Sequence, residues 1–93
     1  MYFEVLVGCN NGEKDPYTHY YAVEAKDIVE ATRKASNFIS TYYIGEDKGT
    51  LLLDHTNIAY RFSDNEIVEL YEINETTPEA FLKDRAGKLF LIA

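Results

Sequence analysis

Apolar and polar residues alternate in two segments near the start of the chain. From Phe3 to Cys9 the apolar residues fall on every second position, and the same period returns from Tyr17 to Ala25. Alternation of this kind is typical of a strand with one buried face. Turn-forming residues fill positions 10–16 between the two segments. We therefore predict a β-hairpin of two antiparallel strands.

A helical pattern follows the hairpin. Asp27 stands before it and Glu30 three residues later, which is the spacing of a capping box at a helix start. Gly45 can take the left-handed conformation that closes a helix. We expect an amphipathic helix from residue 28 to near residue 43. Its apolar positions, spaced three or four apart, are Ile28, Ala31, Ala35, Phe38, Ile39 and Tyr42.

Apolar residues in the second half of the chain form shorter groups. A continuous run at 51–53 and an alternating segment at 57–62 each predict a strand. Thr77 followed by Pro78 is typical of the first turn of a helix, so we expect a short second helix there. The apolar run at 89–92 predicts a last strand.

Residues 66–73 fit two interpretations. Val68 and Ile73 favour a strand, whereas Ser63 and Glu66 have the spacing of a capping box in front of a helix. We favour the strand, because a turn after the preceding strand would continue an antiparallel meander.

These elements together predict an α+β fold. We expect a mostly antiparallel sheet of five to six strands, one long amphipathic helix on one face, and a short second helix. The chain has 93 residues, of which 46% are hydrophobic. Such a chain is too short for two cores, so residues 1–93 should form a single domain.

The chain carries an excess of acidic residues, which bears on the kind of partner it can bind. Nine Lys and Arg residues stand against sixteen Asp and Glu residues, which gives a formal net charge of −7. This balance argues against direct binding of nucleic-acid phosphates and favours a protein partner with a basic surface. The acidic residues gather between Phe62 and Leu82, where no Lys or Arg occurs. That segment is interpreted either as a solvated face or as a docking surface for the basic partner.

Tyrosine is the second unusual feature, with eight residues in the chain. Tyr71 suits a core position, whereas Tyr20 and Tyr43 lie off the predicted apolar faces. Exposed tyrosine beside carboxylates is typical of a recognition surface. The predicted partner-binding residues are Asp64, Glu66, Glu69, Glu72, Glu75, Tyr20 and Tyr43.

Catalytic and metal-binding patterns are absent from the sequence. Cys9 and His19 could face each other across the first hairpin as a thiol–imidazole pair, but a cysteine on an apolar strand face is more simply a core residue. A zinc site needs four ligands, which the Cys and His residues of this chain do not supply. We predict no catalytic residue, no metal and no cofactor.

The single cysteine excludes an internal disulfide and fits a reducing compartment. The first residues contain neither a basic segment nor an apolar stretch long enough for a signal or a membrane span. We therefore expect a cytoplasmic location without membrane contact.

One stretch resembles known proteins. The sequence Tyr-Ala-Val-Glu-Ala-Lys-Asp-Ile-Val-Glu-Ala at 21–31 is similar to the strand-to-helix junction of small phage and mobile-element proteins. Residues 1–45 resemble the N-terminal half of a type I-E anti-CRISPR inhibitor. The resemblance implies a compact, non-catalytic protein that blocks a host defence complex by occupying a surface, and it transfers no residue role. With the acidic, Tyr-bearing surface, we expect the partner to be a host complex that handles nucleic acid. The alternatives are a homo-oligomeric structural or accessory subunit, with monomer and dimer both open, and a small Cys/His enzyme.

Overall fold

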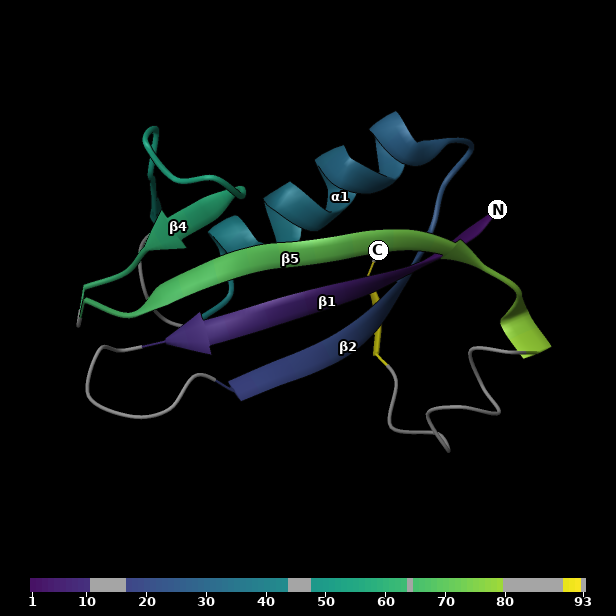
Figure 1. Cartoon of the computed structure of the whole chain (residues 1–93), viewed down its shortest axis with the longest axis horizontal. Coiled ribbons are helices and arrows are strands. Elements are labelled where there is room, and N and C mark those ends of the chain that lie inside the picture. The colour runs from purple at the N-terminus through teal and green to yellow at the C-terminus, as the bar shows by residue number, and fades with distance from the viewer. Residues whose placement is uncertain (11–16, 44–47, 64, 80–89, 93) are drawn as a thin grey trace.

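The computed structural model describes residues 1–10, 17–43, 48–63, 65–79 and 90–92. Figure 1 shows one twisted sheet with a helix packed across one of its faces. In chain order the elements of this part of the chain are β1 (Tyr2–Asn10), β2 (Tyr17–Glu24), α1 (Ile28–Ser40), β3 (Thr50–Leu51), β4 (Ala59–Arg61), β5 (Ile67–Thr76) and β6 (Phe90–Ile92). The predicted α+β class, with one helix on one face of a mostly antiparallel sheet, is confirmed.

The sheet has the strand order β3-β4-β5-β1-β2-β6. Five of these strands pair antiparallel, with β1 between β2 and β5. The predicted hairpin of β1 and β2 is confirmed, while its loop lies outside the described residues. β6 pairs with β2 in parallel. β1 is therefore central, and its side chains define both faces of the sheet.

One face of the sheet forms the core with α1. Val5 and Val7 on β1 are fully buried, and they share that face with Ala31 and Ala35 of the helix in one hydrophobic cluster. Alanine has only a methyl side chain, so the helix can approach the strands closely. The predicted alternation along β1 is confirmed, because Phe3 and Cys9 at its two ends are also buried.

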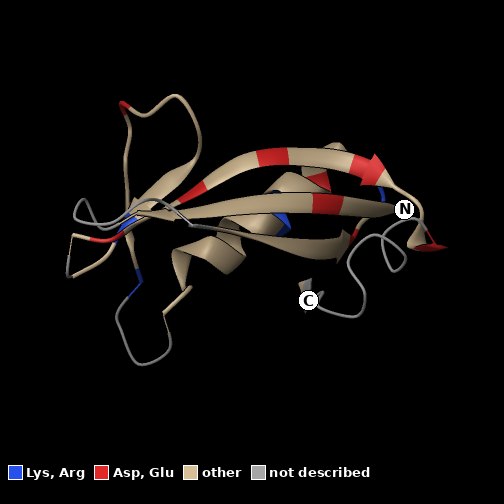
Figure 2. Ribbon diagram, turned by 60° about the horizontal axis from the view of Figure 1, so that its bottom comes forward, with Lys and Arg blue, Asp and Glu red and all other residues tan. Residues whose placement is uncertain are grey.

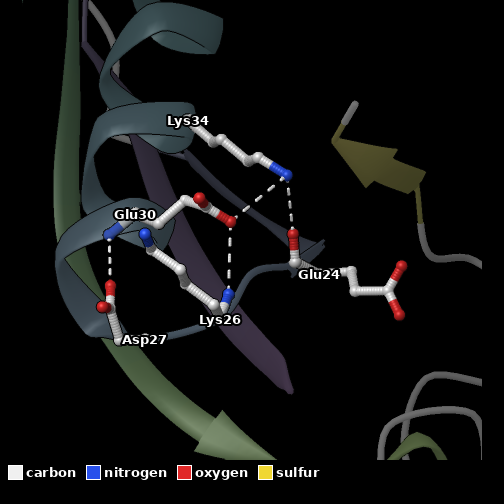
Figure 3. A network of polar contacts seen from close by, with 5 residues as sticks. All are labelled: Glu24, Lys26, Asp27, Glu30 and Lys34. Carbon is white, nitrogen blue, oxygen red and sulfur yellow. Dashed lines mark hydrogen bonds and ion pairs between the residues drawn. The ribbon is translucent and has the colours of Figure 1, made fainter.

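The start of α1 follows the predicted capping box. The Asp27 carboxylate accepts a hydrogen bond of 2.8 Å from the backbone N–H of Glu30, and the Glu30 carboxylate accepts one of 3.2 Å from the N–H of Lys26 (Figure 3). Lys34 donates to the backbone oxygen of Glu24 at 2.9 Å. These bonds hold the helix start against the end of β2.

The limits of the helix differ from the prediction. α1 ends at Ser40, because Thr41 already has non-helical dihedral angles, with φ −124° and ψ 35°. Ile28 was expected on the buried face but is 47% exposed. It is the first residue of the helix and lies before Ala31, where the helix first meets the core. The predicted closing residue, Gly45, lies outside the described residues.

The segment 66–73 is a strand, as favoured, except that Glu66 precedes it, since β5 begins at Ile67 and continues to Thr76. The strand predicted at 51–53 is instead the two-residue strand β3, Thr50–Leu51. Leu53 lies beyond it and is 89% exposed. Of the short helix predicted to open at Pro78, the described residues Pro78 and Glu79 are helical, and the rest of that prediction falls on residues 80–89, which lie outside the described part of the chain. None of the described helices is long and apolar enough to cross a membrane.

Candidate protein-docking face

The face of the sheet opposite α1 is the candidate site, and we call it the open face. On β1 the side chains between the buried ones point to this face, and the strand register carries the same face to β2 and β5. The described part of the chain has its helix on the other side (Figure 1). The open face consists of Tyr2, Glu4, Leu6 and Gly8 on β1, Thr18, Tyr20, Ala22 and Glu24 on β2, and Glu69, Tyr71, Glu72 and Asn74 on β5.

The register arranges the centre of this face in rows across the strands. Leu6 lies between Tyr20 on β2 and Glu72 on β5. Leu6 and Tyr20 are both half-buried, so each leaves part of an apolar surface in contact with solvent. In the next row Glu4 lies beside Ala22. The centre is thus a small apolar and aromatic patch with carboxylates on its borders.

A β-bulge in β5 places Tyr71 on this face. Leu6 pairs with Glu72 and Val7 with Leu70, so Tyr71 is the extra residue between them. Its ring covers the backbone of Gly8: a Cβ at Gly8 would lie 2.7 Å from the Tyr71 hydroxyl oxygen and in contact with the ring carbons. Glycine at this position therefore allows the ring to lie across β1.

The same bulge brings two carboxylates together. In a regular strand, residues three apart point to opposite faces, but the extra residue puts Glu69 and Glu72 on one face. Glu69 is half-buried, and its carboxylate accepts a hydrogen bond of 2.8 Å from the side-chain amide of Asn57. This bond orients Glu69 from outside the strand.

The structure divides the predicted acidic segment. Glu69 and Glu72 lie on the open face with Tyr20, whereas Glu75 pairs with the buried Phe3 and points to the opposite side. Glu66 is half-buried before β5, where its backbone oxygen accepts a hydrogen bond of 2.8 Å from the N–H of Phe62. Asp64 lies outside the described residues.

Tyr43 and Tyr71 are placed differently from the prediction. The ring of Tyr43 packs against Tyr42 at 5.3 Å and Phe62 at 5.0 Å between ring centroids, so Tyr43 joins the helix side of the sheet. Tyr71 was expected in the core and is half-buried on the open face. Sequence reasoning also missed Tyr2, Glu4 and Leu6. The one signal for the bulge was the change of apolar spacing on β5 from two residues to three before Ile73.

Charge on the open face has mainly one sign. Figure 2 shows acidic residues along the central strands of the sheet, and those on the open face are Glu4, Glu24, Glu69 and Glu72. Arg61 lies at the end of this face, opposite Ile67. Arg33 and Lys34 belong to the helix on the other side. The field over the open face is therefore negative and suits a basic partner surface.

The two residues of the candidate thiol–imidazole pair differ in burial. Cys9 is 1% exposed and pairs with Tyr17 across the hairpin, whereas His19 is exposed and pairs with Val7. On the same side, burial and then a hydrogen bond of 2.6 Å to the Tyr21 hydroxyl raise the pKa of Tyr42. A phenol held in its protonated form does not serve as a base at neutral pH.

Possible metal ligands and pockets are the remaining features of the described part of the chain. It contains no group of three or more His, Cys, Asp or Glu residues that could hold a metal ion. A shallow pocket of about 370 Å³ lies on the helix side, lined by Arg33, Lys34, Asn37, Phe38 and Ile92. This lining has no nucleophile or general base, and the Lys34 amine already donates to Glu24. The pocket therefore does not suggest a reaction.

Comparison with known proteins yielded no matching family model, curated relative or solved structure.

Proposed function

We propose that this chain is a non-catalytic binding protein that docks onto a basic protein surface through its open face. The observation that carries the proposal is the patch of Leu6, Tyr20 and Tyr71, bordered by carboxylates, on the sheet face opposite α1. An apolar and aromatic centre with a polar rim is the usual anatomy of a protein interface. Tyrosine adds contact area at a low cost in conformational entropy.

Carboxylates at the rim act mainly on the choice of partner and on the rate of association. Negative charge steers a basic surface toward the patch and repels an acidic one. A second copy of the chain, which would be an accessory or structural oligomer, fits this face less well. Its own Glu4 and Glu72 would approach the same residues of the first copy, and like charges would oppose that contact.

The partner class that we propose is a host defence complex that handles nucleic acid, in which basic grooves bind phosphates. A protein that covers such a groove would inhibit the complex without catalysis and without binding nucleic acid itself. The class follows from the resemblance expected of residues 1–45 to a type I-E anti-CRISPR inhibitor, and the observation that supports it is the negative open face. The proposed location is the host cytoplasm, where such complexes act.

The proposal can be tested in cells that carry active type I-E interference against a phage. Expression of the chain should restore plaque formation. The variant Glu4→Gln/Glu69→Gln/Glu72→Gln should lose this effect, because three carboxylates of the open face become neutral. The matched control is Asp54→Asn/Glu75→Gln/Glu79→Gln, which changes the net charge equally at exposed residues that are not among those of the open face as defined above.

The control variant should restore plaques as the parent chain does. Equal loss in both variants would show that net charge alone matters, which contradicts a docking face. Failure of the parent chain to restore plaques would contradict the proposed inhibition of this complex.

A further inference from the structure

Tyr71 has a geometry that goes beyond a general acidic docking face. Its ring lies across Gly8 because the bulge adds one residue to β5 opposite β1. The ring is half-buried, so the sheet supports one part of it while another part contacts solvent. A supported aromatic ring on a flat strand surface is a platform on which a planar group can stack.

Carboxylates stand on both sides of this platform along β5. Glu69 pairs with Gly8, the residue under the ring, and Glu72 pairs with Leu6 in the next row. The bond from Asn57 fixes Glu69, whereas Glu72 is exposed. A cation that stacks on the ring can therefore meet an oriented carboxylate on one side and an exposed one on the other.

The chemical group that fits this arrangement is a guanidinium. It is planar, it stacks on aromatic rings, and its several N–H donors can reach carboxylates in the plane of the group. We infer that the platform formed by Gly8, Glu69, Tyr71 and Glu72 binds an arginine side chain of the partner. This inference rests on the proposed docking function and identifies the residue type at its centre.

Lysine would be a weaker occupant for a physical reason. Its ammonium group is compact and strongly hydrated, so it would interact with the carboxylates without stacking flat on the ring. A site that only attracts positive charge would bind both residue types equally. A site that uses the ring of Tyr71 should prefer arginine.

Two peptides of equal length and charge separate these cases, namely hexa-arginine and hexa-lysine. Each is titrated into the isotope-labelled chain, and amide chemical shifts are followed by NMR. Hexa-arginine should shift the amides of Gly8, Glu69, Tyr71 and Glu72 and should bind about threefold more tightly than hexa-lysine, as expected for one exposed cation–π contact. The preference should vanish in Tyr71→Leu and persist in Tyr2→Leu, which removes another tyrosine of the open face.

The outcomes distinguish the arginine platform from the acidic docking face. Equal affinity of both peptides, with shifts on the open face, would overturn the arginine platform and leave the acidic docking face in place. No shift on the open face with either peptide would overturn both.

A second pair of variants keeps the test valid if Tyr71→Leu folds poorly. Glu72→Gln changes an exposed side chain beside the platform, and Glu75→Gln changes an exposed one on the opposite side. Only Glu72→Gln should weaken hexa-arginine binding, and equal effects of the two would contradict the platform.

Discussion

At the scale of single residues, Gly8 is the position on which the open face depends most. A side chain there would occupy the space of the Tyr71 ring. Glycine inside a strand costs about 0.5–1 kcal/mol relative to alanine when nothing else changes. The fold tolerates this cost within its longest pairing, between β1 and β5. The gain is a tyrosine ring placed on the exposed surface of the sheet.

We predict that Gly8→Ala destabilises the protein by about 1 kcal/mol, because the new methyl group forces the Tyr71 ring away from β1. In the background Tyr71→Ala the same change should instead stabilise the fold by about 0.5 kcal/mol, since only the backbone effect remains. Urea denaturation of the four chains of this double-mutant cycle measures both values. The same free-energy change in both backgrounds would show that Gly8 and Tyr71 do not interact.

At the scale of elements, the helix start illustrates what local sequence determines. The cap at Asp27 and Glu30 was predicted from spacing alone, and the Asp27 carboxylate accepts the expected bond from the Glu30 N–H, while the Glu30 carboxylate accepts from the N–H of Lys26, one residue before the cap. The cap needs only residues within one turn, so its prediction requires no knowledge of the sheet. The alternation that predicted β1 is equally local, and its buried side chains are as expected.

We predict that Asp27→Ala lowers the free energy of unfolding by about 1 kcal/mol, because the N–H of Glu30 loses its acceptor at the helix start. Asp27→Asn is the matched control, since an asparagine side chain can still accept this bond, and it should cost much less. Thermal unfolding followed by circular dichroism compares the two variants. Equal destabilisation by Asp27→Ala and Asp27→Asn would mean that Asp27 stabilises the fold through its charge and not through the capping hydrogen bond.

Features that depend on pairing between distant strands were not predictable in the same way. The bulge at Tyr71 decides which glutamates share a face, and it arises from the register of β5 against β1. Because of the bulge, Glu69 shares a face with Glu72, which regular alternation would not predict. Glu72 and Glu75 lie three residues apart with no bulge between them, so regular alternation alone separates them. Tyr43 was expected at the surface because it lies off the apolar positions of the helix. Its packing on Phe62 joins residues from different elements, which the helical spacing does not record. A single sequence carries no direct record of such contacts.

At the scale of the whole molecule, the two faces of the sheet differ in burial and in side-chain type. One face holds α1 and the core of β1, with Val5 and Val7 fully buried. The other presents tyrosines and carboxylates of one sign. The open face carries four glutamates with Arg61 at its end, whereas the helix side combines Arg33 and Lys34 with Glu30 and Glu75. Under the proposed function, the negative open face would be the side that approaches a basic partner.

The central claim is that the open face, and not the total charge, makes the contact. The most direct test is the affinity of the purified chain for a purified type I-E effector complex, measured for the parent and for the two matched triple variants. We predict that Glu4→Gln/Glu69→Gln/Glu72→Gln binds at least about tenfold more weakly, whereas Asp54→Asn/Glu75→Gln/Glu79→Gln stays within about twofold of the parent. Equal affinities of the two variants would contradict the account.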